Sequence, residues 1–202
     1  MIREMRTAIL STLSLFVLTA VLYPALLLGV GLIVPVQASG SLIDAQGNYT
    51  QDPAAAVGSA LIGQPFTEDQ YFWSRPSVVN YSSAEPEDDP HNILKTGVSG
   101  ASNYAPSNPA LIEFVEERRT SLRAAGFQEI PPDLVYTSGS GLDPHISLAA
   151  AQAQLERVAA ARNLDSEDIL PLIEKAIDHR FLGIFGEPGV NVLRLNLTLD
   201  QL

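Results

Sequence analysis

Cysteine is absent from the 202 residues, histidine occurs only three times, and charged residues make up only 17% of the chain. Without cysteine the chain can form no disulfide framework, no thiolate nucleophile and no cysteine-ligated metal site. The shortage of charge beside 46% hydrophobic residues is unusual for a soluble domain. It indicates that part of the chain belongs in a membrane.

Ionisable side chains are missing from Thr7 to Ile43, apart from Tyr23. About 20 helical residues cross a hydrocarbon core of about 30 Å, and this run supplies them. We expect a transmembrane helix over residues 7–33, in which Pro24 makes a kink that neighbouring groups accommodate. A cleaved signal peptide is the alternative, because the small residues before Ser39 fit a cleavage site. The apolar run is nearly twice the length of a signal sequence's apolar region, which favours an uncleaved anchor.

The basic residues at the start of the chain predict its orientation. Arg3 and Arg6 precede the apolar run, and the first charge after it is Asp44. Positive residues stay inside, so residues 1–6 are expected in the cytoplasm and the rest of the chain outside it. With a net charge of −11, the exported part is strongly acidic, which disfavours binding to nucleic acid.

The exported part divides into a linker and domain entry over residues 34–56 and one domain over residues 57–202. Caps and hydrophobic periodicity predict its elements. They are a short strand ending in a turn at 58–65, a helix opened by Asn108–Pro109 and ended by Gly126, a strand at 134–137, a helix capped by Ser147 and running to Ala161, a helix at 166–178, and a half-buried strand at 190–199. Segregated helices and few strands predict an α+β fold, with the whole chain forming one transmembrane helix and a single extracytoplasmic mixed α/β domain.

The segment from Ser138 to Ser147 invites a chemical interpretation more than any other. A membrane-anchored hydrolase would use Ser140 or Ser138 as nucleophile and His145 as base. The pattern G-x-S-x-G is missing, however, and Asp143 is too close to His145 in sequence to orient it easily. The favoured interpretation is a glycine turn whose side chains bind backbone groups. Nucleotide binding is the third interpretation, with candidate residues Ser138, Gly139, Ser140, Gly141, Asp143 and His145, although no phosphate-loop lysine follows these glycines.

Metal binding and ligand stacking have weaker signals. His91, His145 and His179 lie far apart, and none belongs to an H-E-x-x-H pair, so we predict no metal site. Arg75 lies within an aromatic segment and is expected to stack on Trp73 or Tyr71.

Several motifs, in one order along nearly the whole chain, carry a family resemblance. They are Ser59–Phe66, Tyr71–Ser77, Ser99–Asn103, Pro106–Pro109, Pro132–Val135, Ser138–Ser147, Arg157–Arg162 and Gly186–Leu193. With the N-terminal span, the sequence resembles the C subunit of the Kdp-type potassium-transporting ATPase. Its departures are an acidic loop at Glu85–Pro90 and Tyr136 within the Leu-Val-x-Thr motif.

The resemblance implies a non-catalytic accessory subunit in a bacterial inner-membrane complex. The implied partners are a channel-like potassium-binding subunit, an ATP-hydrolysing P-type subunit and a small membrane subunit. The family's proposed role is to support assembly and, as a catalytic chaperone, to raise the ATP affinity of the hydrolysing subunit. ATP and K⁺ then belong to the complex, no cofactor is held tightly, and an exported domain influences ATP only indirectly. Candidate partner contacts are Ser11, Ser14, Tyr23, Pro24, Trp73 and Arg75.

Overall fold

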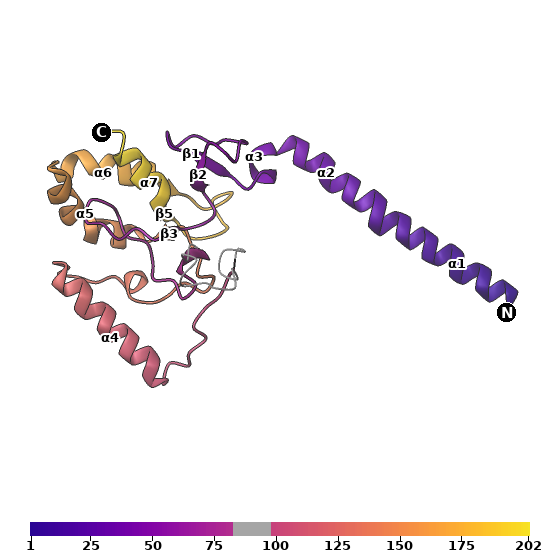
Figure 1. Cartoon of the computed structure of the whole chain (residues 1–202), viewed down its shortest axis with the longest axis horizontal. Helices are drawn as coiled ribbons and strands as arrows, with labels where there is room; N and C mark the ends of the chain where they lie inside the picture. The colour runs from indigo at the N-terminus through magenta and orange to yellow at the C-terminus, as the bar shows by residue number, and fades with distance from the viewer. Residues whose placement is uncertain (83–97) are drawn as a thin grey trace.

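The computed structural model describes residues 1–82 and 98–202, and it divides into a long N-terminal helix and a folded domain (Figure 1). The predicted acidic loop at Glu85–Pro90 and the predicted isolation of His91 lie outside the described residues. The described part mixes helices with short strands, which confirms the expected α+β fold.

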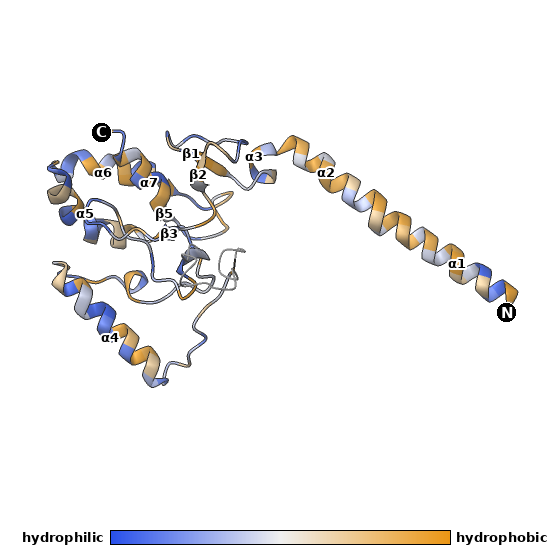
Figure 2. Ribbon diagram, in the orientation of Figure 1, coloured by the Kyte–Doolittle hydropathy of each residue, from blue (hydrophilic) through white to orange (hydrophobic). Residues whose placement is uncertain are grey.

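The N-terminal helix is continuous from Ile2 to Ile33, 32 residues long, and apolar enough to cross a membrane. It consists of α1 (Ile2–Phe16), the π-helical segment η1 (Val17–Leu22) and α2 (Tyr23–Ile33). Its surface is almost wholly apolar beyond the first turns (Figure 2). The predicted span of residues 7–33 lies within it and ends at the same residue.

Pro24 does not kink this helix, contrary to expectation, and Figure 1 shows it straight. A proline removes one backbone donor and crowds the carbonyl four residues earlier. The π-helical segment directly ahead of Pro24 widens the helix, and the Tyr23 amide donates to the carbonyl of Leu18, five residues back. The wider turn relieves the crowding locally, so the axis does not have to bend.

The folded domain begins earlier than the predicted boundary at residue 57. After the short helix α3 (Pro35–Ala38), strand β1 (Leu42–Asp44) pairs antiparallel with β2 (Ala56–Ser59). Ile43 is buried against Ala60 and Leu193, so the predicted linker at 34–56 already contributes to the core. The expected short strand before the turn at Gly63 is β2, shifted toward the N-terminus.

Two helices begin and end where their caps predict. Helix α4 (Pro109–Ala124) opens at Asn108, whose side chain accepts from the Ala110 amide, and Gly126 follows it with φ +94°. Helix α5 (Leu148–Arg162) opens at Ser147, which accepts from the Ala150 amide. The next helix, α6 (Ser166–Lys175), is shorter than predicted, because the chain enters strand β4 (Ile177–Asp178).

The predicted strand at residues 190–199 is wrong. Only β5 (Gly189–Asn191) is extended, and α7 (Val192–Leu199) follows at once. The Asn191 side chain accepts from the Arg194 amide and starts the helix. Burial then follows a helical period, not the alternation of the leucines. The buried residues of α7 are Val192, Leu193, Leu195, Asn196 and Leu199.

The predicted strand at residues 134–137 is also wrong. The chain there forms the 3₁₀ turn η4 (Pro132–Leu134), in which the Val135 amide donates back to the Pro132 carbonyl. Proline fixes φ near the helical value, and the turn uses this to bury Leu134. A second 3₁₀ turn, η2 (Asn80–Ser82), precedes the undescribed segment.

A second small antiparallel sheet has three strands in the order β3–β5–β4, with β3 at His145–Ile146. Helices α5, α6 and α7 contribute most of the core that packs with it, and Figure 1 shows these helices gathered on one side of the domain. The sheet therefore sets the position of His145 at its edge, beside the loop that joins β4 to β5.

Two buried side-chain amides hold the irregular backbone at Phe72 and Trp73. Gln154 of α5 accepts from the Trp73 amide at 2.7 Å and donates to its carbonyl at 3.1 Å. Asn196 of α7 makes the same pair of bonds to Phe72, at 2.9 and 3.0 Å. Both amides are 0–1% exposed. They replace the strand that would otherwise satisfy these backbone groups, and we call them the amide clamp.

Gln154→Leu removes half of the amide clamp and leaves the amide and carbonyl of Trp73 unpaired inside the domain. We expect the free energy of unfolding to fall by about 2–4 kcal/mol, since each unsatisfied buried polar group costs roughly 1–3 kcal/mol. Denaturant unfolding of the detergent-solubilised chain, followed by the fluorescence of its one tryptophan, measures this. Gln152→Leu, exposed on the same helix, is the control and should change stability by less than about 0.5 kcal/mol. Equal losses in the two variants would contradict the clamp.

Candidate functional site

A chain of five charged side chains runs across the three-stranded sheet, from His145 on β3 to Asp178 on β4. Arg75 binds Asp143 at 2.9 Å, and Arg194 binds Asp178 at 3.0 Å. His145 lies between the two carboxylates, with Nε2 2.8 Å from Asp178 and Nδ1 3.7 Å from Asp143. We call these five residues the polar cluster. Four of them, all but Arg194, line an open hollow of about 670 Å³.

The two carboxylates keep the imidazole charged. Hydrogen bonding to Asp143, and then to Asp178, raises the pKa of His145 to about 9. The Asp178 contact is the shorter, so it is the bond that the geometry supports best. Burial works to raise the pKa of Asp143, but hydrogen bonds from His145 outweigh it and lower that pKa. The hydrogen bond from His145 also lowers the pKa of Asp178.

The serines of the predicted motif bind backbone groups. The Ser138 hydroxyl accepts from the Gly141 amide at 2.8 Å, and the Ser140 hydroxyl accepts from the Leu142 amide at 3.1 Å. Asp143 accepts in the same way from the amide of His145. This is the glycine turn that the sequence favoured.

Gly139 and Gly141 differ in what their positions demand. A Cβ at Gly139 would meet nothing within 4 Å. Gly141 has φ +69°, and a Cβ there would lie 2.7 Å from the Gly100 carbonyl oxygen. The motif therefore needs Gly141 for the close approach of two loops.

The hydrolase geometry is not formed. A serine nucleophile needs a histidine nitrogen free to take its proton. Both nitrogens of His145 face carboxylates, and the hydroxyls of Ser138 and Ser140 accept from nearby amides. The structure thus brings Asp143 and His145 together but turns the serines to other partners.

Three amides of this loop are engaged and are not available to a phosphate group. Phosphate binding at a loop needs backbone amides that point outward without partners. In this loop the amides of Gly141, Leu142 and Ser147 all donate to side chains of the protein, that of Ser147 to Asp133. The carboxylates of Asp133 and Asp143 would also repel a phosphate group.

The stacking predicted for Arg75 is wrong. Arg157 of α5 lies over the Trp73 ring at 3.9 Å, and Arg162 lies over Tyr71 at 5.1 Å. Arg75 instead pairs with Asp143. Both stacking arginines come from a helix some 80 residues further along the chain, and their spacing from the rings gave no sequence signal.

The polar cluster also contains residues that the sequence did not indicate. Asp178 follows His145 by 33 residues and Arg194 follows Asp178 by 16. Only the pairing of β3 and β4 with β5 brings them together. Within residues 1–82 and 98–202, no group of three or more His, Asp and Glu side chains could hold a metal ion. In the polar cluster the carboxylates are neutralised by arginines and His145.

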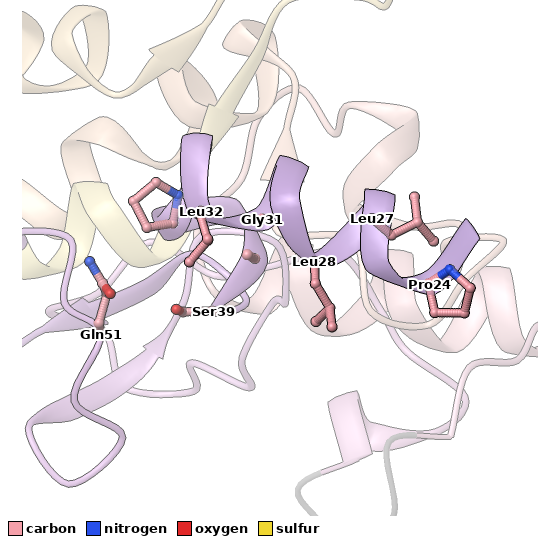
Figure 3. Close-up of a pocket in the computed structure, with 9 residues that line it drawn as sticks. Pro24, Leu27, Leu28, Gly31, Leu32, Ser39 and Gln51 are labelled. Atoms are coloured by element: carbon pink, nitrogen blue, oxygen red, sulfur yellow. The ribbon is translucent and has the colours of Figure 1, made fainter. Parts of the chain in front are cut away.

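The other candidate contacts lie on the long N-terminal helix. Ser11, Ser14 and Tyr23 are exposed, and Pro24 is partly exposed in an apolar notch of about 660 Å³. Figure 3 shows the notch between the end of α2 and the turn into the domain. Its lining residues are Pro24, Leu27, Leu28, Gly31, Leu32, Pro35, Ala38, Ser39 and Gln51.

Comparison with known sequences decides the family. The sequence model described as KdpC, the K⁺-transporting ATPase c chain, matches residues 5–201. The chain belongs to the KdpC family. This confirms the resemblance that the ordered motifs indicated.

Relatives of this KdpC-family chain cover almost its full length. A potassium-transporting ATPase KdpC subunit of Synechocystis sp. is 54% identical over 203 residues, covering all of both chains. One of Microcystis aeruginosa is 53% identical over 99% of this chain and 96% of its own. One of Methylibium petroleiphilum is 46% identical over 97% and 96%. The likeness therefore includes both the long N-terminal helix and the domain.

The polar cluster predicts that the free energy of unfolding falls as the pH becomes alkaline. The pKa of His145 is 6.5 when unperturbed and about 9 in the fold, so its stabilisation is complete below 6.5 and is lost as pH rises through about 9. We expect a loss of about 1–2 kcal/mol over this window, after discounting for solvent screening of a partly exposed group. Unfolding of the full chain at several pH values measures it.

His145→Gln should flatten this loss, because the titrating group is gone. His179→Gln, which changes an exposed histidine nearby, should keep the loss seen in the unchanged chain. A slope that survives in His145→Gln would assign the pH dependence to another group.

Proposed function

We propose that this chain is a non-catalytic accessory subunit of a potassium-transporting ATPase complex. The observation that carries the proposal is the polar cluster. The histidine that a catalytic reading would need has both nitrogens engaged by carboxylates, and the nearby serines bind backbone amides. These groups stabilise the fold, so the chain contributes contacts to the complex instead of chemistry. The family, described as the c chain of the ATPase, supports membership of that complex.

The membrane helix is the proposed site of assembly. Helices associate in a bilayer through small residues and close packing, because lipid gives them no hydrophobic drive. The notch beside Gly31 offers such a close approach, and Ser11 and Ser14 add small polar groups on α1. We propose that a helix of the channel-like potassium-binding subunit or of the small membrane subunit packs here.

The proposed orientation follows from Arg3 and Arg6, which hold the N-terminus in the cytoplasm. The domain is then extracytoplasmic and cannot touch a nucleotide bound to the ATP-hydrolysing subunit. An effect on ATP affinity passes through the membrane helices, and such coupling is reciprocal in binding free energy. The engaged amides of the Ser138–Ser147 loop support this indirect route.

Removing this chain from cells that keep the other subunits should impair assembly of the complex and uptake of potassium. Gly31→Leu should weaken co-purification of the other subunits from detergent, because the side chain fills the notch. Gly29→Leu is the matched control, since Gly29 has nothing within 4 Å of an added Cβ and does not line the notch. Full uptake without the chain would refute the proposal, and equal effects of the two leucines would refute the notch as the contact.

A reporter fused after Leu202 tests the orientation. We expect a periplasmic reporter enzyme to be active there and a cytoplasmic reporter to be silent, because the single span carries the C-terminus across. Replacing Arg3 and Arg6 by glutamate should reduce this bias. A reporter active in the cytosol would overturn the exported domain and reopen direct contact with nucleotide.

A further inference from the structure

The turn between β4 and β5 exposes the densest group of large apolar side chains in the described part of the domain. Its four members are 61–73% exposed, namely Phe181, Leu182, Ile184 and Phe185. Monomeric domains rarely leave such a group in water unless it makes a contact elsewhere. We call residues 181–185 the apolar turn.

Two backbone hydrogen bonds close the apolar turn. The Phe181 amide donates to the Phe185 carbonyl at 2.8 Å, and the Phe185 amide donates back at 3.0 Å. Leu182 has φ +53° and Gly183 has φ +74°, so the backbone reverses tightly between the two rings. The rings lie 6.5 Å apart. A preformed turn presents its side chains without a further cost in backbone entropy.

The tether holds the domain close to the membrane. The helix ends at Ile33 and Ser41 is already buried in the domain, so only residues 34–40 connect them. Seven extended residues reach about 25 Å. Four of these are coiled in α3, which shortens the reach further.

The apolar turn projects on the side of the domain from which the membrane helix leaves. Figure 1 shows the segment before β5 reaching toward that side, and Figure 2 shows its apolar character. A short tether and this direction together place the turn at the surface of the bilayer that holds the helix.

The charges beside the apolar turn are balanced, although the whole chain carries −11. Arg180 binds Glu187 at 2.6 Å across the base of the turn. The carboxylates of the polar cluster, which borders the same hollow, are paired with Arg75, His145 and Arg194. This face therefore lacks the net negative charge that repels lipid phosphates.

We propose that the apolar turn inserts into the interfacial region of the bilayer and gives the domain a second membrane contact. Phenylalanine and leucine side chains are suited to the boundary between headgroups and acyl chains. With the helix as one attachment and the turn as another, the domain has a fixed tilt on the membrane. The proposal needs only the membrane helix and holds whichever subunits accompany the chain.

Because the chain has no cysteine, a single introduced cysteine can be labelled at a chosen position to test the proposal. Leu182→Cys places a single thiol in the turn, and Leu202→Cys places one on an equally exposed leucine, 69% against 73%, at the C-terminus away from the helix (Figure 1). Each full chain is labelled with an environment-sensitive fluorophore and reconstituted alone in phosphatidylcholine vesicles, with and without phosphatidylglycerol. Doxyl groups on the acyl chains report lipid contact, and iodide reports contact with water.

We expect the label at residue 182 to show a blue-shifted emission, quenching by doxyl lipid and loss of quenching by iodide. The label at residue 202 should show the reverse. Ile184→Cys repeats the measurement and guards against a disturbed turn at Leu182. Equal iodide quenching at 182 and 202 would overturn the proposal. Protection of 182 only when the other subunits are present would overturn it in favour of a protein contact.

Discussion

The domain depends on the amide clamp. The chain at Phe72 and Trp73 belongs to no helix or strand, and its backbone groups are satisfied by the side chains of Gln154 and Asn196. Because these amides come from α5 and α7, one short segment fixes the positions of two helices. Arg157 adds to this arrangement by donating to the carbonyl of Tyr71 at 3.0 Å while it covers the indole of Trp73. The sheet can stay small because side chains take over the role of a strand.

The charged groups of the polar cluster bind one another, although four of them line an open hollow. In an active site, groups with shifted pKa values face a space that a substrate can enter, with at least one lone pair or proton left to exchange. Here the three shifted groups, Asp143, His145 and Asp178, bind one another, and Arg75 and Arg194 bind the two carboxylates. A raised pKa is thus a property of a structural ion-pair network as well as of catalysis. The pairings of His145 therefore leave neither of its ring nitrogens free to exchange a proton with a substrate.

Local signals in the sequence predicted local structure. Asn108, Ser147 and Gly126 marked helix ends, because capping depends on atoms within a few residues. The alternating leucines of α7 predicted a strand, and that prediction was wrong. Asn191 caps a helix there, and the packing of the core favours the helix. The polar cluster could be predicted only in part, because Asp178 reaches His145 through sheet pairing and not through sequence proximity. The existence of the long N-terminal apolar helix and its end at Ile33 were predicted, because they follow from the hydrophobic run, but the helix begins at Ile2, five residues before the predicted span.

The π-helical segment at Val17–Leu22 has a geometric consequence for the membrane helix. Each residue that a π-turn inserts rotates everything beyond it by about 100° relative to a regular α-helix. Ser11 and Ser14 lie before this insertion, and the notch at Gly31 lies after it. A regular helical wheel drawn from Ile2 to Ile33 would therefore place the two serines and the notch at incorrect angles around the helix axis. The serines of α1 and the notch of α2 therefore face directions that a regular α-helix would not give them.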